Sequence, residues 1–282
     1  MKIAFSTNAY LRFPFAEAIR RLAEIGYRGV EIMADVPHAW PAGLLEQQKQ
    51  EIRNALSRHD MAIANINAFM MNAIADSRQP YWHPSWIEPD IHYRQVRIDH
   101  TMRALSLARE LGAPSISTEP GGPVATGESW SEALKLFVET LKPVVEHAEH
   151  EGVSLLIEPE PGLLLENADQ FEEFMRYFDS PRLGLNFDIG HFFCVGEDPA
   201  ECVRRLRQHV RHIHLEDIAA NRVHAHLIPG EGAIDFSAVF DAIQEIRYDG
   251  WVTIELYPYA EDPDQAAHRA RDRTAKILGS RL

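Results

Sequence analysis

Cysteine is scarce in this sequence. Only Cys194 and Cys202 occur among its 282 residues, and their spacing fits neither a zinc knuckle nor a redox-active pair. We therefore expect both thiols to be buried and chemically inert.

Long apolar runs are also missing. Met1–Ser6 lacks the apolar core of a signal peptide, and no later stretch is apolar enough to cross a bilayer. The sequence predicts a cytoplasmic protein that does not bind membranes.

Positive charge is in deficit. The chain has 28 Lys and Arg against 42 Asp and Glu, which gives a formal net charge of −14. Proteins that bind nucleic acids normally present clustered Lys and Arg, so we expect no nucleic-acid partner. The hydrophobic fraction of 45% matches an ordinary globular protein that can bury a sizeable core.

A glycine-rich phosphate loop is absent as well. An open, doubly wound sheet usually carries a GxGxxG motif after its first strand. Here the first apolar run is followed by Ser6-Thr7-Asn8-Ala9-Tyr10. This absence favours a closed barrel over an open dinucleotide-binding sheet.

Short apolar or β-branched runs alternate with longer amphipathic segments along the whole chain, which is typical of βα units. The eight runs predicted to be strands are Ile3–Ser6, Gly29–Met33, Ala62–Ala68, Ser115–Thr118, Val153–Glu158, Leu183–Asp188, Val210–Leu215 and Trp251–Leu256. Since no linker interrupts them, we predict an α/β fold, a single (β/α)8 TIM barrel domain that spans residues 1–282.

Amphipathic segments between these runs predict helices. They include Phe15–Ile25, Leu44–His59, Tyr93–Leu111, Ser131–His150, Ala168–Phe178 and Phe236–Ile246. Gly26 and Gly112 stand just past two of them, where a left-handed residue that ends a helix costs least.

One connection, at about residues 70–90, is much longer than the others. It is rich in proline and aromatic residues and groups Tyr81, Trp82, His83 and Trp86. Loops of this length in a compact domain are commonly functional. The aromatic residues could form a lid over a pocket, an interface in a homo-oligomer, or a surface excursion packed on itself.

Polar side chains close four successive strands of the predicted barrel. Glu158, Asp188, His214 and Glu255 each end an apolar run. The active site of a barrel forms at the carboxyl ends of its strands, and three carboxylates there would repel one another without a cation between them. We predict that these four residues bind one divalent metal ion. Oxygen-rich ligation with one imidazole favours Mn²⁺ or Mg²⁺, with Co²⁺ and Zn²⁺ as alternatives.

The motifs around these residues resemble those of the xylose-isomerase-like barrel superfamily. The segments are Ile157–Pro159, Asn186–His191, His212–Asp217, His226–Gly232 and Thr253–Glu255. That superfamily contains sugar and sugar-phosphate isomerases and epimerases, inosose and dehydroshikimate dehydratases, hydroxypyruvate isomerase and endonuclease IV. The resemblance covers the C-terminal half of the chain in order; the N-terminal half, including Gly29–Ile32, agrees more weakly.

The resemblance implies roles for single residues. Glu158, Asp188, His214 and Glu255 match the metal ligands of the ketose 3-epimerases, and His191 matches a histidine that contacts substrate. We assign His214 rather than His212 to the metal because His214 begins the His-Leu-Glu-Asp run. We expect His212 to lie in the core or behind the ligands.

Further substrate contacts are expected from four residues. Glu160 shares a face with Glu158, and Glu119 closes the fourth strand. Arg222 and His226 lie in the loop after the seventh strand, where barrels often bind an anionic group.

The pattern of endonuclease IV is not reproduced. Its histidines at the ends of strands three and four are replaced here by Asn67 and Glu119, and His224 stands where an aspartate is expected. We therefore do not expect a nuclease.

The resemblance implies a metal-dependent sugar or sugar-phosphate isomerase or epimerase of carbohydrate metabolism. Its substrate would be a small polyhydroxylated carbonyl compound, and Glu158 and Glu255 would exchange a proton next to the carbonyl through a metal-stabilised enediolate. The alternative is a dehydratase of an inosose-like or dehydroshikimate-like substrate, which begins with the same proton abstraction. A third reading is a barrel subunit without catalytic activity.

Overall fold

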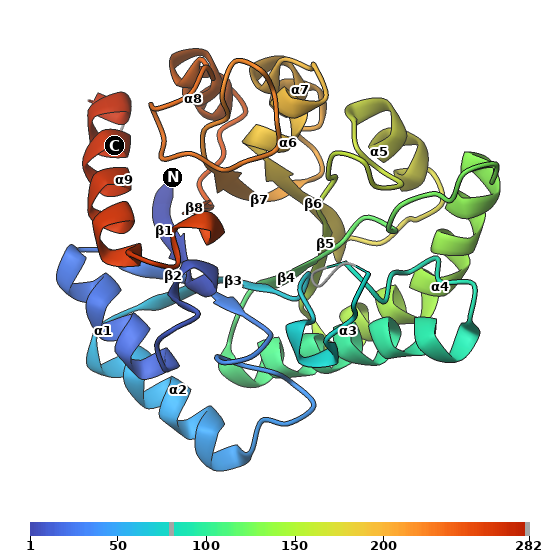
Figure 1. The fold of residues 1–282 in the computed structure, drawn as a ribbon, viewed down its shortest axis with the longest axis horizontal. Helices are drawn as coiled ribbons and strands as arrows, with labels where there is room; N and C mark the ends of the chain where they lie inside the picture. Colours follow the sequence, from blue (N-terminus) through green and yellow to red (C-terminus); the bar gives the residue numbers. More distant parts are fainter. Residues whose placement is uncertain (79–81, 280–282) are drawn as a thin grey trace.

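The computed structural model describes residues 1–78 and 82–279. Its eight strands form a closed, parallel barrel in the order of the sequence, with β1 also paired to β8 (Figure 1). The strands are β1 (Lys2–Ser6), β2 (Gly29–Met33), β3 (Ala62–Asn67), β4 (Ser115–Thr118), β5 (Ser154–Ile157), β6 (Leu183–Asp188), β7 (Val210–Leu215) and β8 (Trp251–Ile254). The predicted TIM barrel is confirmed.

Helices surround the barrel and cover its outer face (Figure 1). They are α1 (Phe15–Ile25), α2 (Glu46–Arg58), α3 (Ile91–Leu111), α4 (Trp130–Glu151), α5 (Ala168–Met175), α6 (Ile189–Cys194), α7 (Pro199–Arg205), α8 (Phe236–Glu245) and α9 (Pro263–Leu278), with the 3-10 turns η1 (Thr7–Tyr10), η2 (Asn72–Ile74) and η3 (Tyr257–Tyr259). No membrane-spanning helix is found among the residues that the structure describes.

The predicted elements agree with the structure within a few residues. Gly26 and Gly112 have φ angles of 112° and 77° and end α1 and α3 as expected of left-handed caps. The pattern did not delimit α6, α7 or α9. The first two span only 6 and 7 residues, which is too short for apolar periodicity to mark them.

The two cysteines differ in exposure. Cys202 is buried, as predicted, whereas Cys194 at the end of α6 is only partly buried. Burial raises the pKa of both thiols to about 12, so both remain protonated at neutral pH.

The long connection between β3 and α3 is anchored to the barrel. The buried guanidinium of Arg97 donates to the carbonyl oxygens of Phe69 and Pro84 at 2.6 and 2.9 Å. Trp86 is fully buried and packs on Phe137, so this aromatic residue belongs to the core rather than to a lid. Tyr81 lies outside the described residues.

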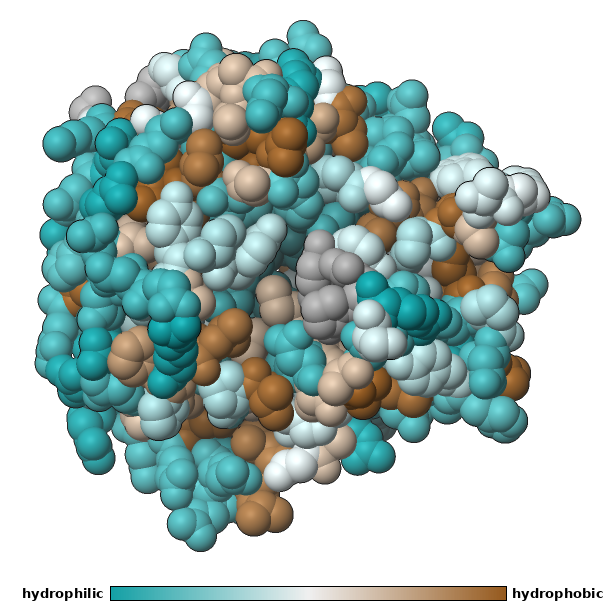
Figure 2. Space-filling model, viewed as in Figure 1, coloured by the Kyte–Doolittle hydropathy of each residue, from teal (hydrophilic) through white to brown (hydrophobic). Residues whose placement is uncertain are grey.

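Hydrophilic side chains dominate the face of the molecule seen in Figure 2, where a hollow lies near the centre, over the barrel. The apolar core lies in the layer between strands and helices, as shown by the fully buried Phe5, Phe137 and Phe187. Inside the barrel mouth the buried side chains are polar, and these residues form the site described next.

Candidate metal centre and active site

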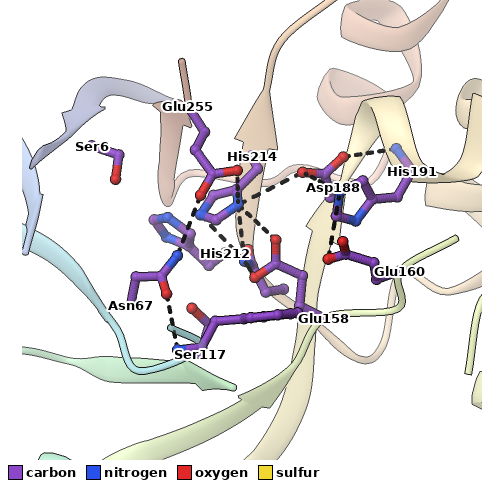
Figure 3. A network of polar contacts seen from close by, with 12 residues as sticks. Ser6, Asn67, Ser117, Glu158, Glu160, Asp188, His191, His212, His214 and Glu255 are labelled. Carbon is purple, nitrogen blue, oxygen red and sulfur yellow. Dashed lines mark hydrogen bonds and ion pairs between the residues drawn. The ribbon is translucent and has the colours of Figure 1, made fainter. Parts of the chain in front are cut away.

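Glu158, Asp188, His214 and Glu255 lie together at the mouth of the barrel (Figure 3). Asp188 is the last residue of β6 and His214 lies on β7, while Glu158 and Glu255 directly follow β5 and β8. Each offers one ligand atom, and these atoms all lie within 4.8 Å of one another. The structure thus brings together the four residues that the sequence predicted as metal ligands.

The strand register explains this convergence. Asp188 pairs with His214 across β6 and β7. The backbone N–H of Glu158 still donates to Thr118, and that of Glu255 to Leu215, both at 3.2 Å. The side chains at these strand ends therefore lie at the same level along the barrel axis.

The His214 ring points its Nδ1 atom at the three carboxylates. Glu158 Oε1 is 2.9 Å away, and Asp188 Oδ2 and Glu255 Oε2 are each 3.7 Å away. Burial opposes a charge on His214, but the carboxylates of Glu158, Glu31 and Glu255 outweigh it and hold the pKa of the imidazole well above its usual value. Burial, together with the neighbouring carboxylates, raises the pKa of Glu255 well above the normal range.

The donor set fits a divalent cation. Asp188 Oδ2 is buried and has no hydrogen-bond partner, although it faces His214 Nδ1. An unpaired buried carboxylate oxygen is costly, and a cation among three carboxylates and one imidazole would satisfy it.

Residues behind the ligands fix their orientation. His214 Nε2 donates to Glu31 Oε2 at 2.8 Å. Asn186 Nδ2 donates to Glu158 Oε2 and Asn8 Nδ2 to Glu255 Oε1, each at 2.8 Å. Sequence reasoning did not identify these supports, although Glu31 and Asn186 both stand in segments that resemble the family motifs.

His212 lies behind the ligands, with its Nε2 3.5 Å from Glu31 Oε2. Its ring is fully buried and does not belong to the group of four. This position agrees with the role expected for it.

A pocket that is partly open to solvent lies beside the four residues, with about 410 Å³ of empty space. Its described lining consists of Asn67, Phe69, Met70, Glu158, Glu160, His191, His224, His226, Glu255 and Tyr257. The predicted substrate contacts Glu160, His191 and His226 are among them. Phe69, Met70 and Tyr257 were not predicted, because aromatic and apolar residues in loops carry no pattern that separates a pocket wall from packing.

Three histidines form one wall of this cavity. His191 follows Asp188 by one helical turn, and its backbone N–H donates to Asp188 Oδ1 at 2.8 Å. His224 and His226 come from the loop after β7. The Nε2 atom of His224 lies 3.0 Å from that of His191 and 3.1 Å from that of His226.

Asp217 holds the loop that carries His224 and His226. Its Oδ2 accepts from the N–H groups of Gly230 and Gly232 at 2.9 and 2.8 Å. A side chain at position 232 would meet Ile218 O at 2.3 Å, so glycine is required for this close approach.

Glu160 lies beside the histidines. Its carboxyl oxygens are 3.9 Å from His191 Nε2 and 3.6 Å from His224 Nδ1. Burial, and then the nearby charges of Glu158, Asp188 and Glu255, raise the pKa of Glu160 well above its usual value. The group is therefore a candidate proton donor.

Glu119 and Arg222 were predicted to contact substrate, and the structure places both outside the described lining. Glu119 accepts from the N–H groups of Trp86 and Gly121 at 2.9 and 2.8 Å, so it ties the long connection to β4. The guanidinium of Arg222 donates to the carbonyl oxygen of Phe193 at 2.9 Å and lies over its ring. The backbone at Arg222 is left-handed, with φ of 59°.

Comparison with known proteins agrees with this geometry. The family model described as "Xylose isomerase-like TIM barrel" matches residues 19–276. The chain is 27% identical to fructoselysine 3-epimerase of Escherichia coli O157:H7 over 99% of its own length and 98% of the relative's. It is 24% identical to inosose dehydratase of Clostridium beijerinckii, over 91% of its own length and 87% of the relative's.

A solved structure has the same fold. The IOLI protein with a bound zinc atom superimposes with a TM-score of 0.82 at 19% identity, covering 100% of this chain and 99% of the other.

Proposed function

The chain belongs to the xylose isomerase-like TIM barrel family, and from that premise we propose that it is a divalent-metal-dependent isomerase or epimerase of a small polyhydroxylated carbonyl compound. One observation carries the proposal. Glu158 and Glu255 line the same cavity from β5 and β8, and a carboxylate oxygen of each faces His214 Nδ1.

Glu158, Asp188, His214 and Glu255 would hold the ion. When bound, it would polarise the substrate carbonyl and make the adjacent C–H more acidic. With three carboxylates and one imidazole, Mn²⁺ or Mg²⁺ is the proposed ion, and the zinc in the IOLI structure makes Zn²⁺ the alternative to test.

The two glutamates would divide the proton transfer. One carboxylate removes the proton from the carbon next to the carbonyl, and the other returns a proton to the opposite face, which inverts that carbon. Asn186 and Asn8 hold the second oxygens of Glu158 and Glu255, so that each keeps its remaining oxygen directed to the site.

The cavity favours an uncharged substrate. Within its described lining no side chain is Lys or Arg, whereas three are glutamates. A phosphate group would find no cationic partner there apart from a bound ion. We therefore propose a non-phosphorylated sugar or sugar derivative as the substrate. Fructoselysine 3-epimerase and inosose dehydratase are named after compounds of this kind.

Dehydration is the second candidate function, and Glu160 favours it. Its buried carboxyl group lies in the cavity with a raised pKa, so it could protonate a leaving hydroxyl after the same first proton abstraction. The relationship to inosose dehydratase points in the same direction. A cytoplasmic location and a possible homo-oligomer remain predictions from the sequence.

Proton exchange in D₂O tests the proposal. The metal-loaded protein is incubated with ketoses, their phosphates and cyclic polyol ketones, and products are followed by NMR and mass spectrometry. We expect metal-dependent incorporation of deuterium next to the carbonyl of a non-phosphorylated compound, with an epimer or isomer as product. Loss of water as the only reaction would identify the dehydratase. If no compound in the panel exchanged a C–H proton, the proposed activity would be rejected for that substrate class.

A further inference from the structure

Arg97 of α3 is fully buried, and its guanidinium holds both ends of the long connection between β3 and α3. Nη1 donates to the carbonyl oxygens of Ala68 and Phe69 at 3.2 and 2.6 Å. Nε donates to that of Pro84 at 2.9 Å, and Nη2 to that of Trp82 at 3.2 Å. One side chain thus joins the start of the connection to a segment near its end.

A purely structural anchor does not need this positive charge. Glu119 Oε1 lies 4.0 Å from Arg97 Nε, and both side chains are fully buried. A buried ion pair is often no more stabilising than well-packed apolar side chains of similar volume. What the guanidinium provides is a rigid, planar set of donors that fixes the backbone it contacts.

Phe69 connects this anchor to the end of β3. The residue whose carbonyl oxygen accepts from Arg97 also donates its backbone N–H to Asn67 Oδ1 at 3.0 Å. Asn67 is the last residue of β3 and is buried. Because its amide oxygen is held by Phe69, the Nδ2 atom turns toward the site.

The amide of Asn67 reaches the carboxylate of Glu255. Asn67 Nδ2 lies 3.3 Å from Glu255 Oε1, to which Asn8 Nδ2 also donates at 2.8 Å (Figure 3). The other oxygen, Oε2, faces His214 Nδ1 at 3.7 Å. Two donors from different parts of the barrel therefore fix the rotation of this carboxylate, one from η1 and one from the end of β3.

We propose that Arg97 is a positioning residue for Glu255. It holds Phe69, Phe69 orients Asn67, and Asn67 together with Asn8 sets the direction of the carboxylate. The inference rests on the proposed function, in which Glu255 is both a metal ligand and one of the two bases. Small displacements of such a group slow a reaction strongly, so the long connection would contribute to catalysis although Arg97 itself does not reach the cavity.

Arg97→Lys is the test variant, because it keeps a positive charge near Glu119 while a single ammonium nitrogen cannot reach all four carbonyl oxygens. Competition with a chromogenic chelator measures metal affinity at the site that includes Glu255, and it needs no substrate. We expect a fall of about three- to tenfold, less than is usual for a direct partner of a ligand. Arg94→Lys is the matched control and should bind metal as the wild type does, since Arg94 of the same helix donates to the carbonyl oxygen of Glu88 at the far end of the connection.

A double-mutant cycle separates positioning from general destabilisation. Asn67→Ala removes the link to Glu255, so adding Arg97→Lys to it should weaken metal binding by less than about twofold more. Asn8→Ala removes the other donor to Glu255 Oε1, and in that background Arg97→Lys should keep its full effect. A loss of stability alone would lower the affinity equally in both backgrounds.

Kinetics give a second measurement once a substrate is known. In Arg97→Lys, kcat should fall about tenfold while KM changes by less than about threefold, because a displaced base affects the transition state more than substrate binding. Arg97→Met combined with Glu119→Gln replaces the lysine variant if that variant does not fold, since it leaves no lone charge in the core. It should show the same loss of metal affinity.

Other outcomes overturn the inference. Wild-type metal affinity in a folded Arg97 variant, or an equal effect of Arg97→Lys in the wild-type and Asn67→Ala backgrounds, would remove the role of Arg97 and leave the proposed function intact. A wild-type protein that binds no divalent ion would instead overturn the proposed function, and with it the role of Arg97.

Discussion

Glu31 on β2 accepts a hydrogen bond from His214 on β7, with 2.8 Å between Oε2 and Nε2. Both side chains are fully buried. The bond places a hydrogen on Nε2, so that Nδ1 is the atom that the ring turns toward Glu158, Asp188 and Glu255. Asn65 Nδ2 donates to the same Glu31 oxygen at 2.9 Å, so the carboxylate itself is held in place.

Replacing Glu31 should therefore weaken metal binding without touching a ligand. We expect Glu31→Gln to lower the metal affinity of the carboxylate site, which consists of Glu158, Asp188, His214 and Glu255, about 10- to 100-fold. This is the usual effect of losing the hydrogen-bond partner of a metal-bound histidine. Competition with a chromogenic chelator measures it. Glu149→Gln, an exposed change on α4, serves as the control. Unchanged affinity in a folded Glu31→Gln protein would show that the contact does not orient His214.

The contact between Glu31 and His214 shows how much of the site could be predicted from the sequence. The four ligands were predictable because each ends an apolar run, and parallel register brings strand ends to one level. Glu31 and His214 are 183 residues apart, and Asn8 and Glu255 are 247 apart, so no local pattern links them. They meet only because the barrel closes.

The assignments of Glu119 and Arg222 show a second limit. Glu119 does end a strand, but its carboxylate turns to the backbone of Trp86 and Gly121. Sequence position locates the end of a strand and not the direction of the side chain beyond it. His224 shows the opposite case. It does not end a strand but lies in the loop that Asp217 holds, and this loop brings it into the cavity.

Metal removal should destabilise the protein. Without an ion, Glu158, Asp188 and Glu255 are buried together, and the imidazole of His214 among them offsets only part of their charge. An ion present at about 100 times its Kd stabilises the folded state by about 2.7 kcal/mol, which corresponds to a Tm change of roughly 5 °C for a chain of this size. Differential scanning calorimetry with and without a chelator measures it.

The Glu158→Gln variant is the control for this prediction. With a weakened site it should show a smaller metal-dependent shift than the wild type at the same metal concentration. Equal shifts in the two proteins would mean that the stabilising ion binds away from the carboxylates.

Replacing His191 should lower turnover more than it weakens metal binding at the carboxylate site. Its ring lines the cavity but its Nε2 lies 3.6 Å from Asp188 Oδ2, and its Nδ1 is bonded to Pro159. His191→Ala should leave the affinity of the carboxylate site within a few-fold, while kcat/KM falls at least about tenfold through a lost substrate contact. Parallel metal titrations and steady-state kinetics separate the two effects. Loss of metal from the carboxylate site would make His191 one of its ligands.

Glu158 and Glu255 carry the most direct test of the proton-transfer proposal. Glu158→Gln and Glu255→Gln keep the size of the side chain and one oxygen ligand, but they remove the base. We expect weaker metal binding and, at saturating metal, a fall in kcat of at least about a hundredfold, the usual scale for losing general acid–base catalysis. Glu149→Gln, prepared in the same way, should retain wild-type turnover.

The stereochemistry of exchange then assigns a face to each glutamate. If Glu158 and Glu255 serve opposite faces of the substrate, one variant should still exchange the substrate proton with D₂O from one face while it no longer forms the other epimer. NMR of the recovered substrate shows which face retains exchange. Near wild-type turnover in both fully metallated variants would mean that neither glutamate is a base. The proton transfer would then fall to His191 or Glu160, whose side chains lie 3.9 Å apart at the cavity wall, and Glu158 and Glu255 would act as ligands alone.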